Sequence, residues 1–193
     1  MKDYKTYFLM QAPDVPDYVK NKVPDFFAAD AVLEAAEIGD GNLNYVFRVK
    51  DKVSGKTIIV KQAGAATRIS KDMIISTDRG RIEAKILQIQ AEMAPGLVPK
   101  VYLYDGVMCA IIMEDMIGHT MMRTGLLKHE IYPRFAEDIS TFMARTLLLS
   151  TDVVLNHKEK KERVKGFINP DLCEITEDLV YTEPYNDCRK HNH

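Results

Sequence analysis

The segment from Gly39 to Asn44, which reads Gly-Asp-Gly-Asn-Leu-Asn, constrains the fold more than any other part of the chain. A strand-like run over 33–38 precedes it, and the residues from Tyr45 to Lys50 alternate between two faces. Alternation with a period of two residues is typical of a half-buried strand. The segment is therefore predicted to be a turn between two antiparallel strands, whereas the glycine turns of dinucleotide-binding folds lead into a helix.

Composition and charge narrow the classes of partner. The chain has 193 residues, of which 46% are hydrophobic, enough for one domain or for one small domain and part of another. With a net charge of −2 and no strongly basic face, we expect no nucleic-acid partner. No apolar run reaches the length of a membrane span, so we expect no membrane partner. The three widely spaced cysteines predict reduced thiols and a cytoplasmic location.

The pattern along the chain predicts a small sheet with one inserted helix. A helix is expected at about 78–93, where Ile82, Ile86 and Ile89 recur at helical spacing. Asp105-Gly106, between two apolar runs, predicts a two-residue hairpin turn with positive φ. The five expected antiparallel strands lie at 33–38, 45–51, 57–62, 98–104 and 107–113.

The remainder of the chain is predicted to be helical. A short helix is expected at 16–23, a longer one from Pro133 to Leu147, and a last one at 171–181. Strands followed by helices indicate the α+β class. The predicted organisation is an N-terminal helical segment, a sheet-containing lobe and a second set of helices, at 1–32, 33–115 and 116–193.

The glycine segment carries the first candidate binding residues. Gly39, Asp40 and Gly41 could bring backbone N–H groups close to phosphate oxygens, because glycine permits positive φ and a close approach. The side-chain amide of Asn44 could donate to a phosphate or fix the turn. The alternative is an ordinary hairpin, since Gly, Asp and Asn are common turn residues.

Two charged residues form the second candidate. Lys61 follows the apolar run 58–60, where an unpaired ammonium would be costly to bury. Glu83 lies at the edge of the apolar face of the predicted helix and could pair with it. The alternatives are a lysine that extends to solvent and a glutamate that pairs with Arg79, four residues earlier.

The third candidate is the abrupt end of an apolar strand in acidic residues. Glu114, Asp115 and Met116 follow 111–113 and precede the helical region, which fits a hinge between two lobes. Backbone groups at such a hinge can bind the edge of an adenine ring. The alternative is a plain strand end.

These features together resemble the methylthioribose kinase family, which belongs to the wider protein-kinase-like group of choline kinases and aminoglycoside phosphotransferases. The resemblance covers the chain from about residue 34 almost to its end. It implies a kinase-like N-lobe followed by the first helices of a C-lobe. The strings that carry it lie at 37–47, 60–63, 78–79, 81–83, 97–99, 111–115, 167–170, 172–173, 175–180 and 184–185.

The resemblance implies an ATP-dependent enzyme that phosphorylates the 1-hydroxyl of 5-methylthioribose in methionine salvage, uses Mg²⁺ and forms a homodimer. Asn44 and Lys61 would contact the nucleotide phosphates, and Glu83 would hold Lys61 in place. Glu114, Asp115 and Met116 would form the adenine-binding hinge.

Two departures from the family pattern bear on catalysis. The stretch 64–76 lacks the family's Trp-Pro-Leu segment, and no histidine of the chain begins a His-x-Asp sequence. We therefore expect no catalytic residue and no metal ligand in these 193 residues. We interpret the chain as the N-terminal portion of a kinase that is inactive alone. The alternatives are a kinase of the same fold for another small alcohol and a non-catalytic nucleotide-binding module.

Overall fold

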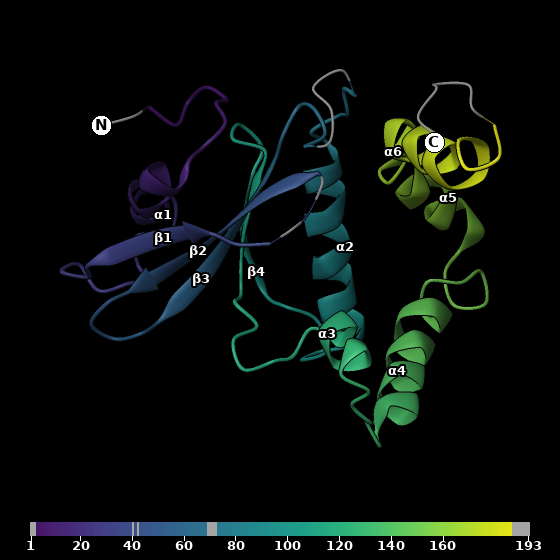
Figure 1. Ribbon diagram of the computed structural model, residues 1–193. Coiled ribbons are helices and arrows are strands. Elements are labelled where there is room, and N and C mark those ends of the chain that lie inside the picture. Colours follow the sequence, from purple (N-terminus) through teal and green to yellow (C-terminus); the bar gives the residue numbers. More distant parts are fainter. Residues whose placement is uncertain (1–2, 40, 42, 69–72, 187–193) are drawn as a thin grey trace.

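An antiparallel sheet lies at the centre of the N-terminal half of the chain (Figure 1). The computed structural model describes residues 3–39, 41, 43–68 and 73–186. In this part of the chain the sheet has five strands in the order β1-β2-β3-β5-β4, and each neighbouring pair is antiparallel. The strands are β1 (Leu33–Glu37), β2 (Asn44–Asp51), β3 (Thr57–Ala63), β4 (Val101–Asp105) and β5 (Ala110–Met113).

One face of the sheet packs against the N-terminal segment. A 3-10 turn, Ala12–Asp14, leads into α1 (Val15–Lys22), with a proline in the first turn as the sequence predicts. Tyr18 and Val19 of α1 are fully buried against alternate residues of the strands. The main hydrophobic core therefore lies between the sheet and residues 4–31, and its strand members include Phe47, Val49, Ile58, Val60, Ala110 and Ile112.

A buried glutamine of β3 hydrogen-bonds the sheet to the N-terminal segment. Gln62, on the core side of β3, has no exposed surface. Its amide oxygen accepts a hydrogen bond from the Met10 N–H at 2.8 Å. Its amide nitrogen donates to the carbonyl oxygens of Phe8 at 2.8 Å and Met108 at 2.9 Å. The side chain thus joins three separate segments, which explains how an uncharged polar group is accommodated there.

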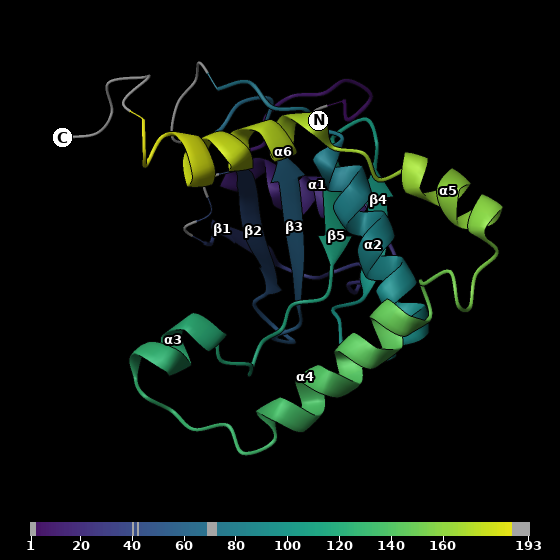
Figure 2. The ribbon, with the colours of Figure 1, turned by 90° about the vertical axis from the view of Figure 1, so that its right-hand side faces the viewer.

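The opposite face of the sheet is flanked by α2 (Arg79–Met93), the inserted helix (Figures 1 and 2). The first turn of α2 lies close to β3, because a Cβ added at Gly80 would lie 3.6 Å from the Cβ of Ala63. The predicted α+β arrangement, five antiparallel strands with one inserted helix, is therefore confirmed.

The predicted two-residue turn at Asp105-Gly106 is wrong. β4 ends at Asp105 and β5 begins only at Ala110, so the loop has four residues. The Asp105 carboxylate accepts hydrogen bonds from the N–H groups of Val107 at 2.9 Å and Met108 at 3.2 Å, which folds the chain into a wider loop. Positive φ occurs at Cys109, where it is 48°.

Helices follow β5, as predicted. They are α3 (Met122–Leu127), α4 (Phe135–Met143), which continues into a π-helical turn at Ala144–Leu148, α5 (His157–Lys165), and α6 (Pro170–Glu177), which continues into a second π-helical turn at Asp178–Thr182. In Figure 2, α6 passes in front of the upper end of the sheet, and α4 lies below the sheet, near the lower end of α2. None of the helices in the described residues has the length and apolar character needed to cross a bilayer.

Candidate functional site

The glycine segment joins two paired strands. β1 and β2 are antiparallel, and the Ile38 N–H donates to the Val46 carbonyl at 2.7 Å beside the turn. Gly39 has a φ of 97°, which requires glycine. A Cβ added at Gly41 would lie 4.0 Å from the Asn44 carbonyl oxygen, and no nearer atom is recorded for it among the described residues. The predicted residue Asp40 lies outside the described residues.

Lys61 and Glu83 meet across the gap between β3 and α2. The Lys61 ammonium donates to the Glu83 carboxylate at 2.6 Å, and the two side chains are 26% and 33% exposed. β3 continues to Ala63, so Lys61 lies within the strand and not at its end. Lys61 therefore does not simply extend to solvent, and Glu83 pairs with the strand lysine and not with Arg79.

Arg79 approaches the glycine segment from the start of α2. Its guanidinium donates to the Leu43 carbonyl at 2.6 Å, to the Asn44 side-chain oxygen at 3.2 Å and to the Ser76 carbonyl at 2.8 Å. Only 6% of Arg79 is exposed. The sequence suggested this arginine only as an alternative partner of Glu83, because its actual acceptors are backbone and amide oxygens that leave no charge pattern.

The predicted hinge begins where β5 ends. The Glu114 N–H donates to the Lys100 carbonyl at 2.8 Å, and the Glu114 carboxylate accepts from the Lys100 N–H at 3.0 Å. The Met116 carbonyl accepts from the His119 N–H at 3.1 Å, and no hydrogen bond within the described residues uses the Met116 N–H. In the hinge, the Glu114 N–H and the Met116 carbonyl are thus hydrogen-bonded, and the Met116 N–H is available to a ligand.

Arg48 of β2 binds the hinge. Its guanidinium donates to both carboxylate oxygens of Asp115, at 2.6 and 2.9 Å, and the Asp115 side chain is only 3% exposed. The hydrogen bonds to Asp115 raise the pKa of Arg48. In the sequence, Arg48 is merely one residue in the alternation of a strand, and nothing there indicates a partner 67 residues away.

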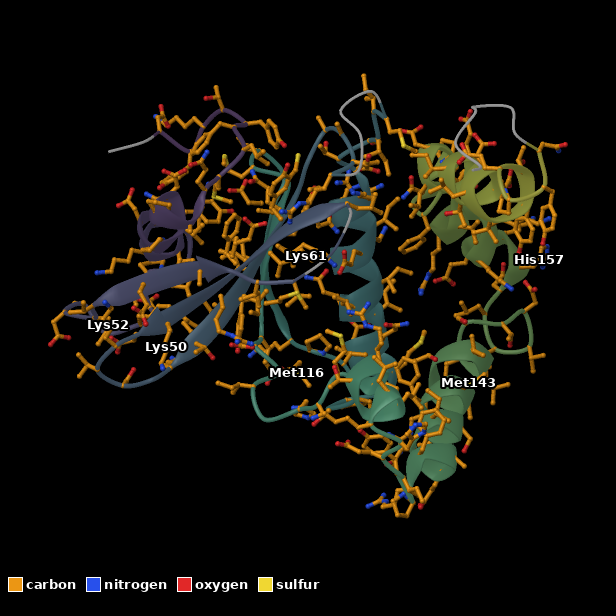
Figure 3. The ribbon with its side chains drawn as sticks, viewed as in Figure 1. Lys50, Lys52, Lys61, Met116, Met143 and His157 are labelled. Atoms are coloured by element: carbon orange, nitrogen blue, oxygen red, sulfur yellow. The ribbon has the colours of Figure 1, made fainter. Side chains whose placement is uncertain are left out.

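The candidate residues share one face of the sheet. Lys61 lies opposite Val46 in β2 and Ile111 in β5, and Arg48 lies opposite Ile59. Because directly opposite residues of antiparallel strands point to the same side, these side chains face away from the N-terminal segment. Figure 3 shows Lys61 beside α2 and Met116 lower in the same view.

This face of the sheet therefore brings together three features. They are the glycine segment, the ion pair of Lys61 with Glu83, and a hinge that the ion pair of Arg48 with Asp115 holds in place. No group of three or more His, Cys, Asp or Glu residues in the described part of the chain could hold a metal ion.

Comparison with known proteins identifies the family. No protein-family model matches the chain. Over 162 residues, or 83% of the chain, it is 44% identical to a methylthioribose kinase of Bacillus velezensis. It is 42% identical to that of Bacillus pumilus over 80% of the chain, and 35% identical to that of Cronobacter sakazakii over the whole chain.

The matched region is only part of each relative. It covers 41% of the Bacillus velezensis protein, 39% of the Bacillus pumilus protein and 48% of the Cronobacter sakazakii protein. The chain thus spans less than half the length of these curated relatives. On the strength of these identities, the chain belongs to the methylthioribose kinase family and matches the N-terminal portion of its members.

Proposed function

We propose that this chain provides the nucleotide-binding part of an ATP-dependent kinase that phosphorylates 5-methylthioribose at its 1-hydroxyl. The observation that carries the proposal is the 2.6 Å contact between Lys61 and Glu83, in a chain whose relatives are named methylthioribose kinases. Kinases of this general fold use such a pair, a lysine on the third strand and a glutamate on the inserted helix, to hold ATP phosphates.

The phosphates would lie between the glycine segment and Lys61. Gly39, Asp40 and Gly41 would offer backbone N–H groups, and the open space around Gly39 and Gly41 supports a close approach. The Asn44 side-chain oxygen accepts from Arg79, which leaves the amide N–H groups of Asn44 to donate to a phosphate oxygen. Lys61, steadied by Glu83, would supply the positive charge.

The adenine ring would bind at the hinge. The Met116 N–H is the proposed donor to the ring, because no acceptor within the described residues engages it. Glu114 and Asp115 would set the position of this donor. Glu114 does so through its two hydrogen bonds with Lys100, and Asp115 through its ion pair with Arg48.

Mg²⁺ would accompany ATP, because phosphoryl transfer needs a cation to neutralise the charge that develops on the phosphates. Because the sequence carries no His-x-Asp motif, we propose no metal ligand among these residues. The place of the reaction in methionine salvage follows from the proposed substrate. A cytoplasmic location and a homodimer remain parts of the proposal that rest on the cysteine pattern and on the family.

The acceptor is tested with the protein encoded by the complete reading frame that contains these residues. Release of ADP is measured with methylthioribose, choline and an aminoglycoside as competing acceptors, and the product is identified by mass and by ³¹P NMR. The proposal expects turnover that depends on methylthioribose, with phosphate at the 1-position. If only another alcohol is phosphorylated, methylthioribose is not the acceptor and that alcohol takes its place in the proposal. If ATP binds without any turnover, the result favours a non-catalytic nucleotide-binding module.

A further inference from the structure

Arg79 is a buried cation for which the proposed reaction has no assigned role. It is 6% exposed, and its three acceptors are the carbonyl oxygens of Leu43 and Ser76 and the amide oxygen of Asn44. It forms no salt bridge with any residue that the structure describes. Burial lowers its pKa, and the nearby Tyr7, Cys109 and Glu83 partly offset this effect. A buried charge held by neutral oxygens alone is costly, so its position calls for a function.

The geometry of α2 places Arg79 and Glu83 on the same side of the helix. They are four residues apart, about one helical turn, so their side chains lie one above the other. Arg79 holds the chain at Leu43 and Asn44, where the glycine segment enters β2. Glu83 holds Lys61 on β3. One rigid helix is thus bonded to both components of the proposed phosphate site.

The third contact of Arg79 fixes the helix end itself. The Ser76 carbonyl, three residues before Arg79, accepts from the guanidinium at 2.8 Å, which ties the start of α2 to the same group that grips the turn. The planar guanidinium can serve three acceptors in fixed directions, which a lysine ammonium on a flexible stem does less well. The arrangement therefore depends on arginine and not merely on a positive charge.

We propose that Arg79 is a positioning residue that sets the Leu43–Asn44 end of the glycine segment at a fixed distance from Lys61. It acts on the nucleotide phosphates through Asn44 and the turn, and this inference rests on the proposed nucleotide-binding function. A nucleoside without phosphates would not depend on Arg79, since its ring would bind at the hinge. If Arg79 positions the turn, replacing it should weaken binding of a ligand with phosphates but not of a nucleoside. If Arg79 only contributes to folding, replacing it should weaken binding of both ligands.

The test compares Arg79→Met with Arg81→Met in the 193-residue chain. Arg81 lies on the same helix, but its side chain is 38% exposed and bonds to Asp78 and to the Gly166 carbonyl, away from the turn. Affinities for ADP and for adenosine are measured by calorimetry. The inference expects Arg79→Met to weaken ADP binding about tenfold, the effect of losing one charged hydrogen bond, and to change adenosine binding less than about twofold. Arg81→Met should change neither.

Hydrogen exchange gives a second readout that does not depend on a ligand. Exchange of the amides of Leu43, Asn44 and Tyr45 should rise in Arg79→Met and stay unchanged in Arg81→Met. If Arg79→Met does not fold, Arg79→Lys is used with the same expected directions, since it retains the charge and loses the three-way donor geometry.

The outcomes distinguish this inference from the proposed function. If the wild type binds neither ADP nor adenosine, the nucleotide-binding proposal is wrong, and with it the inference built on it. If the wild type binds ADP and the arginine variant binds it equally well, or loses ADP and adenosine affinity alike, the positioning role of Arg79 is wrong while nucleotide binding stands. Unchanged exchange at Leu43 to Tyr45 would likewise overturn the positioning role.

Discussion

Arg48 and Asp115 form a bidentate ion pair, at 2.6 and 2.9 Å, that joins the second strand of the sheet to the predicted hinge. The Asp115 side chain is almost fully enclosed, whereas 39% of the Arg48 side chain remains exposed. Two parallel hydrogen bonds fix the relative orientation of both groups. The pair therefore orients the backbone of Glu114 and Met116 relative to the sheet face that carries Lys61.

Replacing Arg48 tests the role of this pair in binding the adenine ring. In Arg48→Met the enclosed Asp115 carboxylate loses its partner, and the hinge backbone should become mobile. We expect adenosine affinity to fall about tenfold or more, since one such hydrogen bond contributes about 1.5–3 kcal/mol. Calorimetry with adenosine measures this, and Arg134→Met is the control, because the Arg134 side chain, immediately before α4, is 74% exposed. Equal adenosine affinity in Arg48→Met and the wild type would contradict the bracing role of the pair.

The buried Gln62 predicts a large effect on stability. In Gln62→Leu the N–H of Met10 and the carbonyls of Phe8 and Met108 lose their partner within the core. We expect the free energy of unfolding to fall by roughly 3 kcal/mol, because each buried group left unpaired costs about 1–3 kcal/mol and the added apolar surface offsets part of the loss.

Urea denaturation measures this loss. Gln88→Leu, at an exposed position of α2, is the matched control and should shift the midpoint little. A change below about 1 kcal/mol in Gln62→Leu would show that the N-terminal segment does not depend on this side chain for its attachment to the sheet.

The Asp105 carboxylate makes stability depend on pH. Burial alone would raise its pKa, but the Lys22 ammonium, 2.9 Å away, and the N–H groups of Met108 and Val107 together lower the pKa below its ordinary value of 3.8. The Tyr18 hydroxyl also donates to this carboxylate, at 3.1 Å, and burial followed by the charge of Asp105 raises the pKa of Tyr18.

The sign follows from the lowered pKa. A carboxyl group with a lower pKa in the folded state stabilises that state above the unfolded pKa, and the stabilisation is lost as pH falls through the folded pKa. We therefore expect Asp105→Asn to be less stable than the wild type at pH 7, with a difference that shrinks below about pH 4. Urea denaturation at pH 7, 5, 4 and 3 measures it. A difference that is constant over this range would mean that ionisation of Asp105 contributes nothing.

The sequence predicted those parts of the fold that depend on local patterns. The alternation after the glycine segment fixed β2 within one residue, and the helical spacing of Ile82, Ile86 and Ile89 located α2. The start of β5 was placed three residues too early, because Asp105 binds two backbone N–H groups and widens the loop that follows β4. The start of β4 was also placed three residues too early, at the other end of that strand. Such side-chain to backbone bonds are not visible in hydropathy.

The contacts that organise the candidate site were predictable only where they followed a family pattern. Lys61 and Glu83 come together as the resemblance implied, although their action on a nucleotide stays a prediction. Arg79 and Arg48 were not predicted, because their partners lie 35 and 67 residues away in the chain and, for Arg79, carry no charge. The helix expected from Pro133 to Leu147 carries the apolar side chains of Phe135 and Ile139, which are 49% and 39% exposed in this structure.

The most direct test of the account is the affinity of this chain for ADP, measured by calorimetry in the wild type, in Lys61→Met and in Lys161→Met. Lys161 is an exposed lysine of α5 and serves as the matched control. The account predicts that the wild type and Lys161→Met bind ADP equally, and that Lys61→Met binds about tenfold or more weakly, the loss of one charge-assisted contact to phosphate. Equal binding of ADP by Lys61→Met and the wild type would contradict it.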